Sequence, residues 1–181
     1  TRGGGDRVDA ARRRGRAVTN DVVAIAGCLT SAQAEGVVAS ASGEWTARAG
    51  RKIYYPYFWF HLRYATRTLL GHSSVRLSCL VDTRTGVTST ADPFELERLE
   101  ANAGVVMKPR LSEDDALRLA HRYSAYAVRN RRKALVVPEV TVLERCLVYK
   151  PFWIVDGTKR SASTFRVLVD GLTGRFHVLR R

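Results

Sequence analysis

The side chains best suited to chemistry in this chain are its 4 histidines and 3 cysteines. The histidines are His61, His72, His121 and His177. None of them belongs to a His-Glu-x-x-His motif or lies at metal-ligand spacing from a cysteine or carboxylate. The cysteines, Cys28, Cys79 and Cys146, are odd in number and far apart, which is not typical of a disulfide framework. We therefore predict no metal, no cofactor and no enzymatic activity, and a reducing compartment such as the cytoplasm.

Two aspartates, Asp82 and Asp170, are the remaining candidates for catalysis as a carboxylate pair. Each begins the same five-residue pattern, Asp-x-x-Thr-Gly. An aspartate can accept hydrogen bonds from backbone N–H groups just ahead of it, and glycine tolerates a positive φ. The repeated context therefore predicts two hairpin turns instead of an active site.

An aromatic run, Tyr-Tyr-Pro-Tyr-Phe-Trp-Phe over residues 54–60, is the most distinctive local feature. Side chains alternate between the two faces of a strand, so Tyr55, Tyr57 and Trp59 are expected on one face. Arginines and lysines flank the run, which would also suit a platform that stacks the bases of single-stranded nucleic acid. We predict a partner-binding surface made of Tyr55, Tyr57 and Trp59, together with Trp153 from a related segment.

The charge is strongly basic: 30 Lys and Arg against 17 Asp and Glu give a net charge of +13. Such a charge attracts nucleic acid, anionic lipid or acidic protein, although an arginine-rich coding bias would produce it too. Residues 1–16 are predicted to be a flexible Arg-rich arm, either a polyanion-binding segment or a solvated terminus. The candidate anion-binding residues are Arg12, Arg13, Arg14, Arg129, Arg131, Arg132 and Lys133.

The hydrophobic periodicity predicts the elements that position these residues. A helix begins at a capping box of Thr30 and Gln33 and ends at Gly43. Strands are expected over 51–63, 75–81 and 87–90, and a short connecting helix over 92–104. A second helix over 112–130 precedes strands at 140–155, 164–170 and 175–179. Pro56 and Pro151 cannot donate ladder hydrogen bonds, which predicts edge strands or bulges there.

Three features recur in the same order in both halves of the chain. They are the capped helix start at 29–34 and 111–116, the Tyr-x-Pro-aromatic-aromatic element at 54–58 and 149–153, and the Val-Asp-x-x-Thr-Gly turn at 81–86 and 169–174. This order resembles the α-β-β-β repeats of PepSY-type and cystatin-like proteins. The resemblance implies non-catalytic binding or inhibitory modules.

The predicted fold class is therefore α+β, with two tandem helix-plus-antiparallel-sheet (α-β-β-β) repeats packed together and a short connecting helix between them. The domains are expected to be the arm at 1–16, the first repeat with its connecting helix at 17–104, and the second repeat at 105–181. No apolar run reaches the roughly 18 residues needed to span a bilayer, so no membrane span is expected.

The predicted function is non-enzymatic binding of a macromolecular partner through the aromatic strand surface and a basic face. A protein partner is favoured. The alternative is a nucleic-acid-binding protein that uses the Arg-rich arm and the 129–133 cluster on phosphates. The sequence leaves the oligomeric state open.

Overall fold

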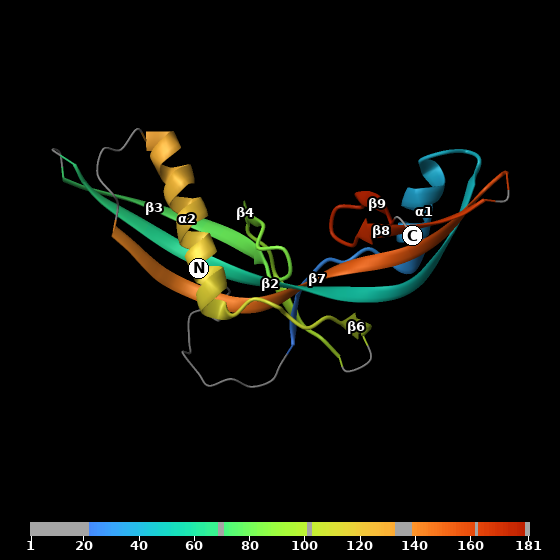
Figure 1. The fold of residues 1–181 in the computed structure, drawn as a ribbon, viewed down its shortest axis with the longest axis horizontal. Helices are drawn as coiled ribbons and strands as arrows, with labels where there is room; N and C mark the ends of the chain where they lie inside the picture. The colour runs from blue at the N-terminus through green and yellow to red at the C-terminus, as the bar shows by residue number, and fades with distance from the viewer. Residues whose placement is uncertain (1–21, 69–70, 101–102, 133–138, 162, 180–181) are drawn as a thin grey trace, which may run out of the picture.

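The computed structural model describes residues 22–68, 71–100, 103–132, 139–161 and 163–179. The predicted arm at 1–16 lies outside the described residues, as does Lys133 of the anion-binding prediction. Within the described ranges the chain forms one mixed sheet of nine strands and two helices (Figure 1).

The elements follow one another along the chain with these bounds. They are β1 (Val23–Ile25), α1 (Ser31–Ser40), β2 (Trp45–Thr68), β3 (Gly71–Asp82), β4 (Thr88–Thr90), β5 (Leu96–Arg98), β6 (Val105–Val106), α2 (Glu113–Arg132), β7 (Glu139–Lys159), β8 (Thr164–Asp170) and β9 (Phe176–Leu179). Strand order is β4-β3-β2-β7-β1-β5, with β6 also on β2, β8 also on β7, and β9 on β8.

Two very long antiparallel strands, β2 and β7, form the spine of the sheet. They have 24 and 21 residues and pair from Trp45 opposite Lys159 to Ala65 opposite Glu139, with two register shifts. The outer side of β2 carries β3 over its second half, and the outer side of β7 carries β8 over its second half. The sheet is therefore broad at both ends, and Figure 1 shows two lobes joined by the β2–β7 ribbon.

Both helices lie on the same face of this sheet. In one lobe α2 covers a core of β2 and β3 side chains, where Ala120 packs with Phe60 and Cys79. In the other lobe α1 covers the start of β2 together with β7 and β8, where Val38 packs with Val155 and Val167. Each helix thus packs on strands from the opposite half of the sequence, and α1 packs on the start of β2 as well.

The predicted fold class of two packed tandem repeats is wrong, because β2 and β7 each run through both lobes of one continuous sheet. Strands of this length extend over roughly 70–80 Å, far beyond the roughly 15 Å and 30 Å of the two helices. The strand prediction began at residue 51, whereas β2 begins at Trp45. Trp45, Ala47 and Ala49 alternate toward α1 and carry the strand into the second lobe.

The predicted connecting helix over 92–104 is also wrong. The described residues of this segment form no helix and include β5, which pairs with β1. Backbone hydrogen bonds fix both ends of the pairing: the Ala26 N–H donates to the Glu95 carbonyl and the Leu99 N–H to the Val22 carbonyl. The N-cap residue and the closing glycine favour a helix only weakly in a segment with few apolar residues. Backbone pairing with the free edge of β1 stabilises the extended conformation more.

The two prolines lie on the central strands, so the prediction of edge strands or bulges for them is wrong. The Pro56 carbonyl accepts from the backbone N–H and hydroxyl of Thr83, and the Pro151 carbonyl accepts from the Gly171 N–H. The N–H and C=O of a residue in an antiparallel ladder point to the same side. The missing proline N–H therefore lies on the outer side of each strand, and the β2–β7 ladder loses no donor.

The two Asp-x-x-Thr-Gly turns confirm their prediction and share one geometry. Asp82 accepts from the backbone N–H groups of residues 84 and 85, and Asp170 accepts from those of residues 172 and 173. Gly86 and Gly174 have φ values of 74° and 71°, a region that favours glycine. The capping box of Thr30 and Gln33 is likewise present at the start of α1.

The packing of α1 on a strand of the second half of the chain predicts which side chains are energetically coupled. Val38→Ala and Val167→Ala should be non-additive in the free energy of unfolding, by about 0.5–3 kcal/mol, because both side chains lie in one buried cluster. Val38→Ala combined with Val81→Ala should be additive, since Val81 belongs to the cluster under α2. Urea unfolding of the single and double variants measures both cycles. Coupling of Val38 to Val81 instead would contradict this topology.

Candidate functional site: an aromatic surface on the helix-free face

The side chains of β2 divide sharply between the two faces of the sheet. Phe58, Phe60 and Leu62 are buried under α2, while the residues between them are half-buried on the face that neither helix covers. This alternation confirms the predicted orientation of the aromatic run. It places Tyr55, Tyr57 and Trp59 together on the helix-free face.

A fourth ring, Phe152 of β7, joins these three residues. The ring centroids of Tyr55 and Tyr57 lie 5.5 Å apart, and those of Tyr55 and Phe152 lie 6.1 Å apart. The term aromatic surface is used below for Tyr55, Tyr57, Trp59 and Phe152. Phe152 was not among the predicted surface residues. In the second Tyr-x-Pro element Phe152 occupies the position that Tyr57 has in the first, so strand alternation could have identified it.

Each turn aspartate also anchors a side chain at the centre of this face. The Tyr55 hydroxyl donates to the Asp82 carboxylate, with oxygen–oxygen distances of 3.1 and 3.3 Å. In the matching position, Lys150 Nζ lies 2.5 Å from Asp170 Oδ2 and 5.4 Å from the centroid of the Phe152 ring. The turns thus fix the direction of the side chains that border the aromatic surface.

Burial and charge determine the protonation states at this centre. Burial raises the pKa of Tyr57, and the carboxylates of Asp82 and Asp170 and the neighbouring Tyr55 raise it further. Tyr57 is therefore a neutral hydroxyl at physiological pH. Burial alone would raise the pKa of Asp170, but hydrogen bonds from Lys150 and from the turn backbone hold that pKa below its usual value.

Asp170→Asn should lower the free energy of unfolding by about 1–3 kcal/mol at pH 7, because it removes a charged acceptor from a mostly buried pair. A carboxyl whose pKa is lowered by folding stabilises the protein above its ordinary pKa of about 3.9 and loses that effect as the pH falls further. The difference between the native chain and the variant should therefore shrink below about pH 4.

Chemical denaturation at a series of pH values measures this difference. Asp156→Asn is the matched control, since the ion pair of Asp156 with Arg166 is more than half exposed and should contribute at most about 1 kcal/mol. An equal loss for both variants, or a difference that does not depend on pH, would contradict the prediction.

Trp153 does not belong to the aromatic surface. It lies on the helix-covered face, where its indole Nε1 donates to the Leu29 carbonyl at 2.8 Å and its ring packs in the cluster under α1. In the repeated element Trp153 occupies the position of Phe58, which is also on the buried face. Its inclusion in the predicted surface therefore conflicts with the alternation used for the other three residues.

The predicted anion-binding residues that the structure describes lie away from the aromatic surface. Arg129, Arg131 and Arg132 lie in the last turns of α2, on the helix-covered side of the sheet. Arg12, Arg13, Arg14 and Lys133 lie outside the described residues.

A small cavity of about 250 Å³ opens at one end of the aromatic surface. We call it the acidic pocket; its lining residues are Trp59, His61, Ser78, Asp92, Pro93, Phe94 and Glu144. His61 lies between Ser78 of β3 and Glu144 of β7 in the strand register. Its Nδ1 is 2.8 Å from the Ser78 hydroxyl.

The His61–Ser78 contact is the one arrangement near the aromatic surface that resembles a base beside a nucleophile. Ser78 lies within a paired strand, and acyl transfer also needs free backbone N–H groups aimed at the developing oxyanion. A sharp turn supplies such groups, whereas a strand uses its N–H groups in the ladder. The geometry therefore gives a hydrogen-bonded polar wall and no complete site for acyl transfer in the part of the chain that the structure describes.

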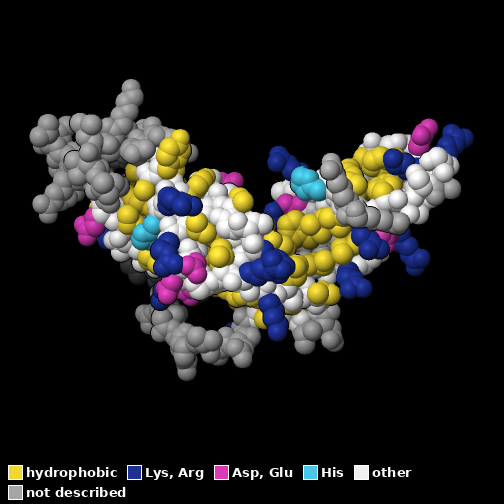
Figure 2. Space-filling view, in the orientation of Figure 1, with side chains coloured by type: hydrophobic (Ala, Val, Ile, Leu, Met, Phe, Trp, Pro, Cys, Tyr) yellow, Lys and Arg dark blue, Asp and Glu magenta, His cyan; other side chains and the backbone are white. Residues whose placement is uncertain are grey.

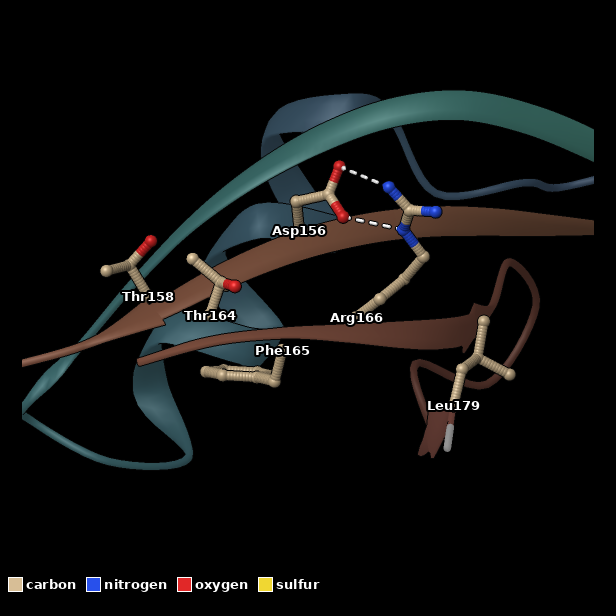
Figure 3. A pocket seen from close by; sticks show the side chains of 7 residues that line it. Asp156, Thr158, Thr164, Phe165, Arg166 and Leu179 are labelled. Atoms are coloured by element: carbon tan, nitrogen blue, oxygen red, sulfur yellow. Dashed lines mark hydrogen bonds and ion pairs between the residues drawn. The ribbon is translucent and has the colours of Figure 1, made fainter. Parts of the chain in front are cut away.

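A second cavity, of about 480 Å³, lies over β7, β8 and β9 (Figure 3). Asp156 and Arg166 point toward each other from neighbouring strands, with a nitrogen–oxygen distance of 2.7 Å. Both are more than half exposed, and no further charged side chain of the described residues lines the cavity. This arrangement is that of a solvated cross-strand pair.

Across residues 22–68, 71–100, 103–132, 139–161 and 163–179, no three His, Cys, Asp or Glu side chains are grouped so that they could hold a metal ion. Neither described helix has the length and apolar character required to cross a membrane. No protein-family model matches the chain, and the comparisons with curated proteins and with solved structures give no match. The resemblance to PepSY-type and cystatin-like repeats stays a prediction.

Proposed function

We propose that the chain is a non-enzymatic binding module that holds a macromolecular partner, most directly a protein, on the aromatic surface. The observation that carries this proposal is the gathering of four half-buried aromatic side chains on the face of the sheet that neither helix covers. Aromatic side chains supply a large contact area with little loss of rotamer freedom, and they dominate the energetics of protein interfaces.

Positive charge borders the surface and supports an acidic partner. Arg84 and Arg110 lie close enough to Tyr55 to act on its pKa, opposing the upward shift that burial and Asp82 cause. Lys and Arg side chains border the hydrophobic side chains between the two lobes in the view of Figure 2. Together with the net charge of +13, this arrangement favours encounter with acidic groups.

The aromatic surface and the arginines at the end of α2 lie on different sides of the sheet, which favours a protein partner over the nucleic acid of the alternative prediction. A single strand stacked on the aromatic surface would have to pass around the sheet to reach the end of α2. We also place the module in a reducing compartment, the cytoplasm in the simplest case, because Cys28, Cys79 and Cys146 are all free thiols.

The test is capture of the partner by the purified chain, at low and moderate salt and with and without nuclease. Tyr55→Ala and Tyr57→Ala should each weaken capture about tenfold or more, as expected for the centre of an interface. Tyr126→Ala is the matched control, since Tyr126 is a 60% exposed tyrosine on α2, on the other side of the sheet. Circular dichroism verifies that each variant is folded.

A defined protein that survives nuclease and is lost with Tyr55→Ala and Tyr57→Ala supports the proposal. Capture of nucleic acid that falls steeply with salt would favour the alternative. Capture that is equally strong with both variants would overturn the assignment of the aromatic surface.

A further inference from the structure

The acidic pocket is built by four separate segments that the fold holds in place. Trp59 and His61 come from β2, Ser78 from β3 and Glu144 from β7, while the loop at 92–94 closes the outer side. Backbone hydrogen bonds from Ala91 to the Ser78 carbonyl and from Ala26 to the Glu95 carbonyl hold both ends of this loop. The walls of the pocket are therefore set by the sheet itself.

The charge of the pocket is opposite to that of the chain. Among the residues that the structure describes, its lining includes two carboxylates, Asp92 and Glu144, and no Lys or Arg. Neither carboxylate has an ion-pair or hydrogen-bond partner among the residues that the structure describes. Arg63 and Arg76, two cross-strand pairs beyond His61 and Ser78, do not line it. In a protein with a net charge of +13, two carboxylates without partners indicate a local preference for cations.

Aromatic rings complete the pocket. The centroids of Trp59 and Phe94 lie 5.5 Å apart with their planes at 64°, so the two rings form adjoining walls. The centroid of the His61 ring lies 6.3 Å from that of Trp59. Adjoining ring faces attract a cation through their negative quadrupoles, and Trp is the strongest such partner.

We propose that the acidic pocket binds an alkylammonium group, with Trp59 and Phe94 facing its alkyl carbons and Asp92 and Glu144 balancing its charge. The volume of about 250 Å³ is below that of pockets for drug-sized ligands and suits one side chain or one small quaternary ammonium ion. This inference rests on the proposed function: the pocket lies at the Trp59 end of the aromatic surface, where a partner on that surface can insert a lysine or methylated lysine.

The test is an NMR titration of the full ¹⁵N-labelled chain, in which Trp59→Phe identifies the indole N–H signal of Trp59. The probes are Nα-acetyl-lysine amide, its Nε-trimethyl form, tetramethylammonium, and uncharged Nα-acetyl-norleucine amide. The trimethylated probe should give a saturable shift of this signal, about tenfold tighter than the norleucine probe. Asp92→Asn combined with Glu144→Gln should weaken it about tenfold, whereas Glu97→Gln, an exposed carboxylate of β5, should leave it unchanged.

The outcomes separate the two sources of the ligand and the two proposals. Tighter binding of the lysine probes than of tetramethylammonium supports a partner side chain; the reverse order supports a small quaternary ammonium metabolite. Equal affinity for the norleucine probe, no saturable shift of the Trp59 signal, or no effect of the carboxylate variants would overturn the inference. Partner capture would still depend on Tyr55 and Tyr57, which do not line the pocket, so the proposed function is tested independently.

Discussion

Phe60→Ala should lower the free energy of unfolding by about 3–5 kcal/mol, the cost of removing a buried ring and leaving a cavity. Phe60 is fully buried under α2, stacked on Phe58 at 6.2 Å between centroids and packed with Ala116 and Ala120. The small alanines of the helix cannot fill the space, because their Cα positions are fixed by the helix backbone. Equilibrium unfolding in urea measures the loss.

The control for this prediction is Arg63→Ala on the same strand. Arg63 is exposed on the helix-free face, so its replacement should change the free energy of unfolding by no more than about 0.5 kcal/mol. The contrast tests which face of β2 carries the core. Similar losses for Phe60→Ala and Arg63→Ala would contradict the register of β2 under α2.

Gly157→Val should destabilise the second lobe by about 1–3 kcal/mol or more, as overpacking does in a filled core. A Cβ atom at Gly157 would lie 2.2–2.7 Å from three carbons of the Phe165 ring on the paired strand β8. That ring is itself packed against Trp45, with 4.7 Å between centroids. A valine at 157 therefore displaces the Phe165 ring, and this displacement also disrupts the contact between Phe165 and Trp45.

Two comparisons make this result specific. Gly43→Ala is the control, because a Cβ there meets no atom within 4 Å. Adding Phe165→Leu to Gly157→Val should recover part of the lost stability, since the smaller side chain removes the clash. Thermal unfolding of the three variants shows both effects. A fully additive double variant would mean that the ring at 165 is not what excludes a side chain at 157.

The interior of several elements follows from the sequence because local physical chemistry determines it. Val75, Leu77, Cys79 and Val81 alternate with mostly polar residues, and the structure places Cys79 and Val81 in the core. The turn at Asp82 depends on hydrogen bonds that close within a few residues. Such features need no information from distant parts of the chain.

The candidate site follows from the sequence only in part. Strand alternation places Tyr55, Tyr57 and Trp59 on one face, but whether a helix covers that face depends on packing between distant segments. Phe94 reaches Trp59 because its loop is fixed between β3 and β1. The expected helix over 92–104 hides this contact, and with it the acidic pocket.

The sequence by itself determined which side chains share a strand face, where the two hairpins turn and where α1 begins. The tertiary structure alone decided that β2 and β7 pair along their length in one sheet. It also decided that α2 covers strands from the other half of the chain and that α1 covers β7 and β8 as well as the start of β2. The physical reason is that backbone hydrogen bonds between strands are nearly the same for any sequence. Which strands pair therefore depends on how the apolar faces of the elements bury one another. Phe60 packs under α2 and Val167 packs under α1 only once the whole sheet is assembled.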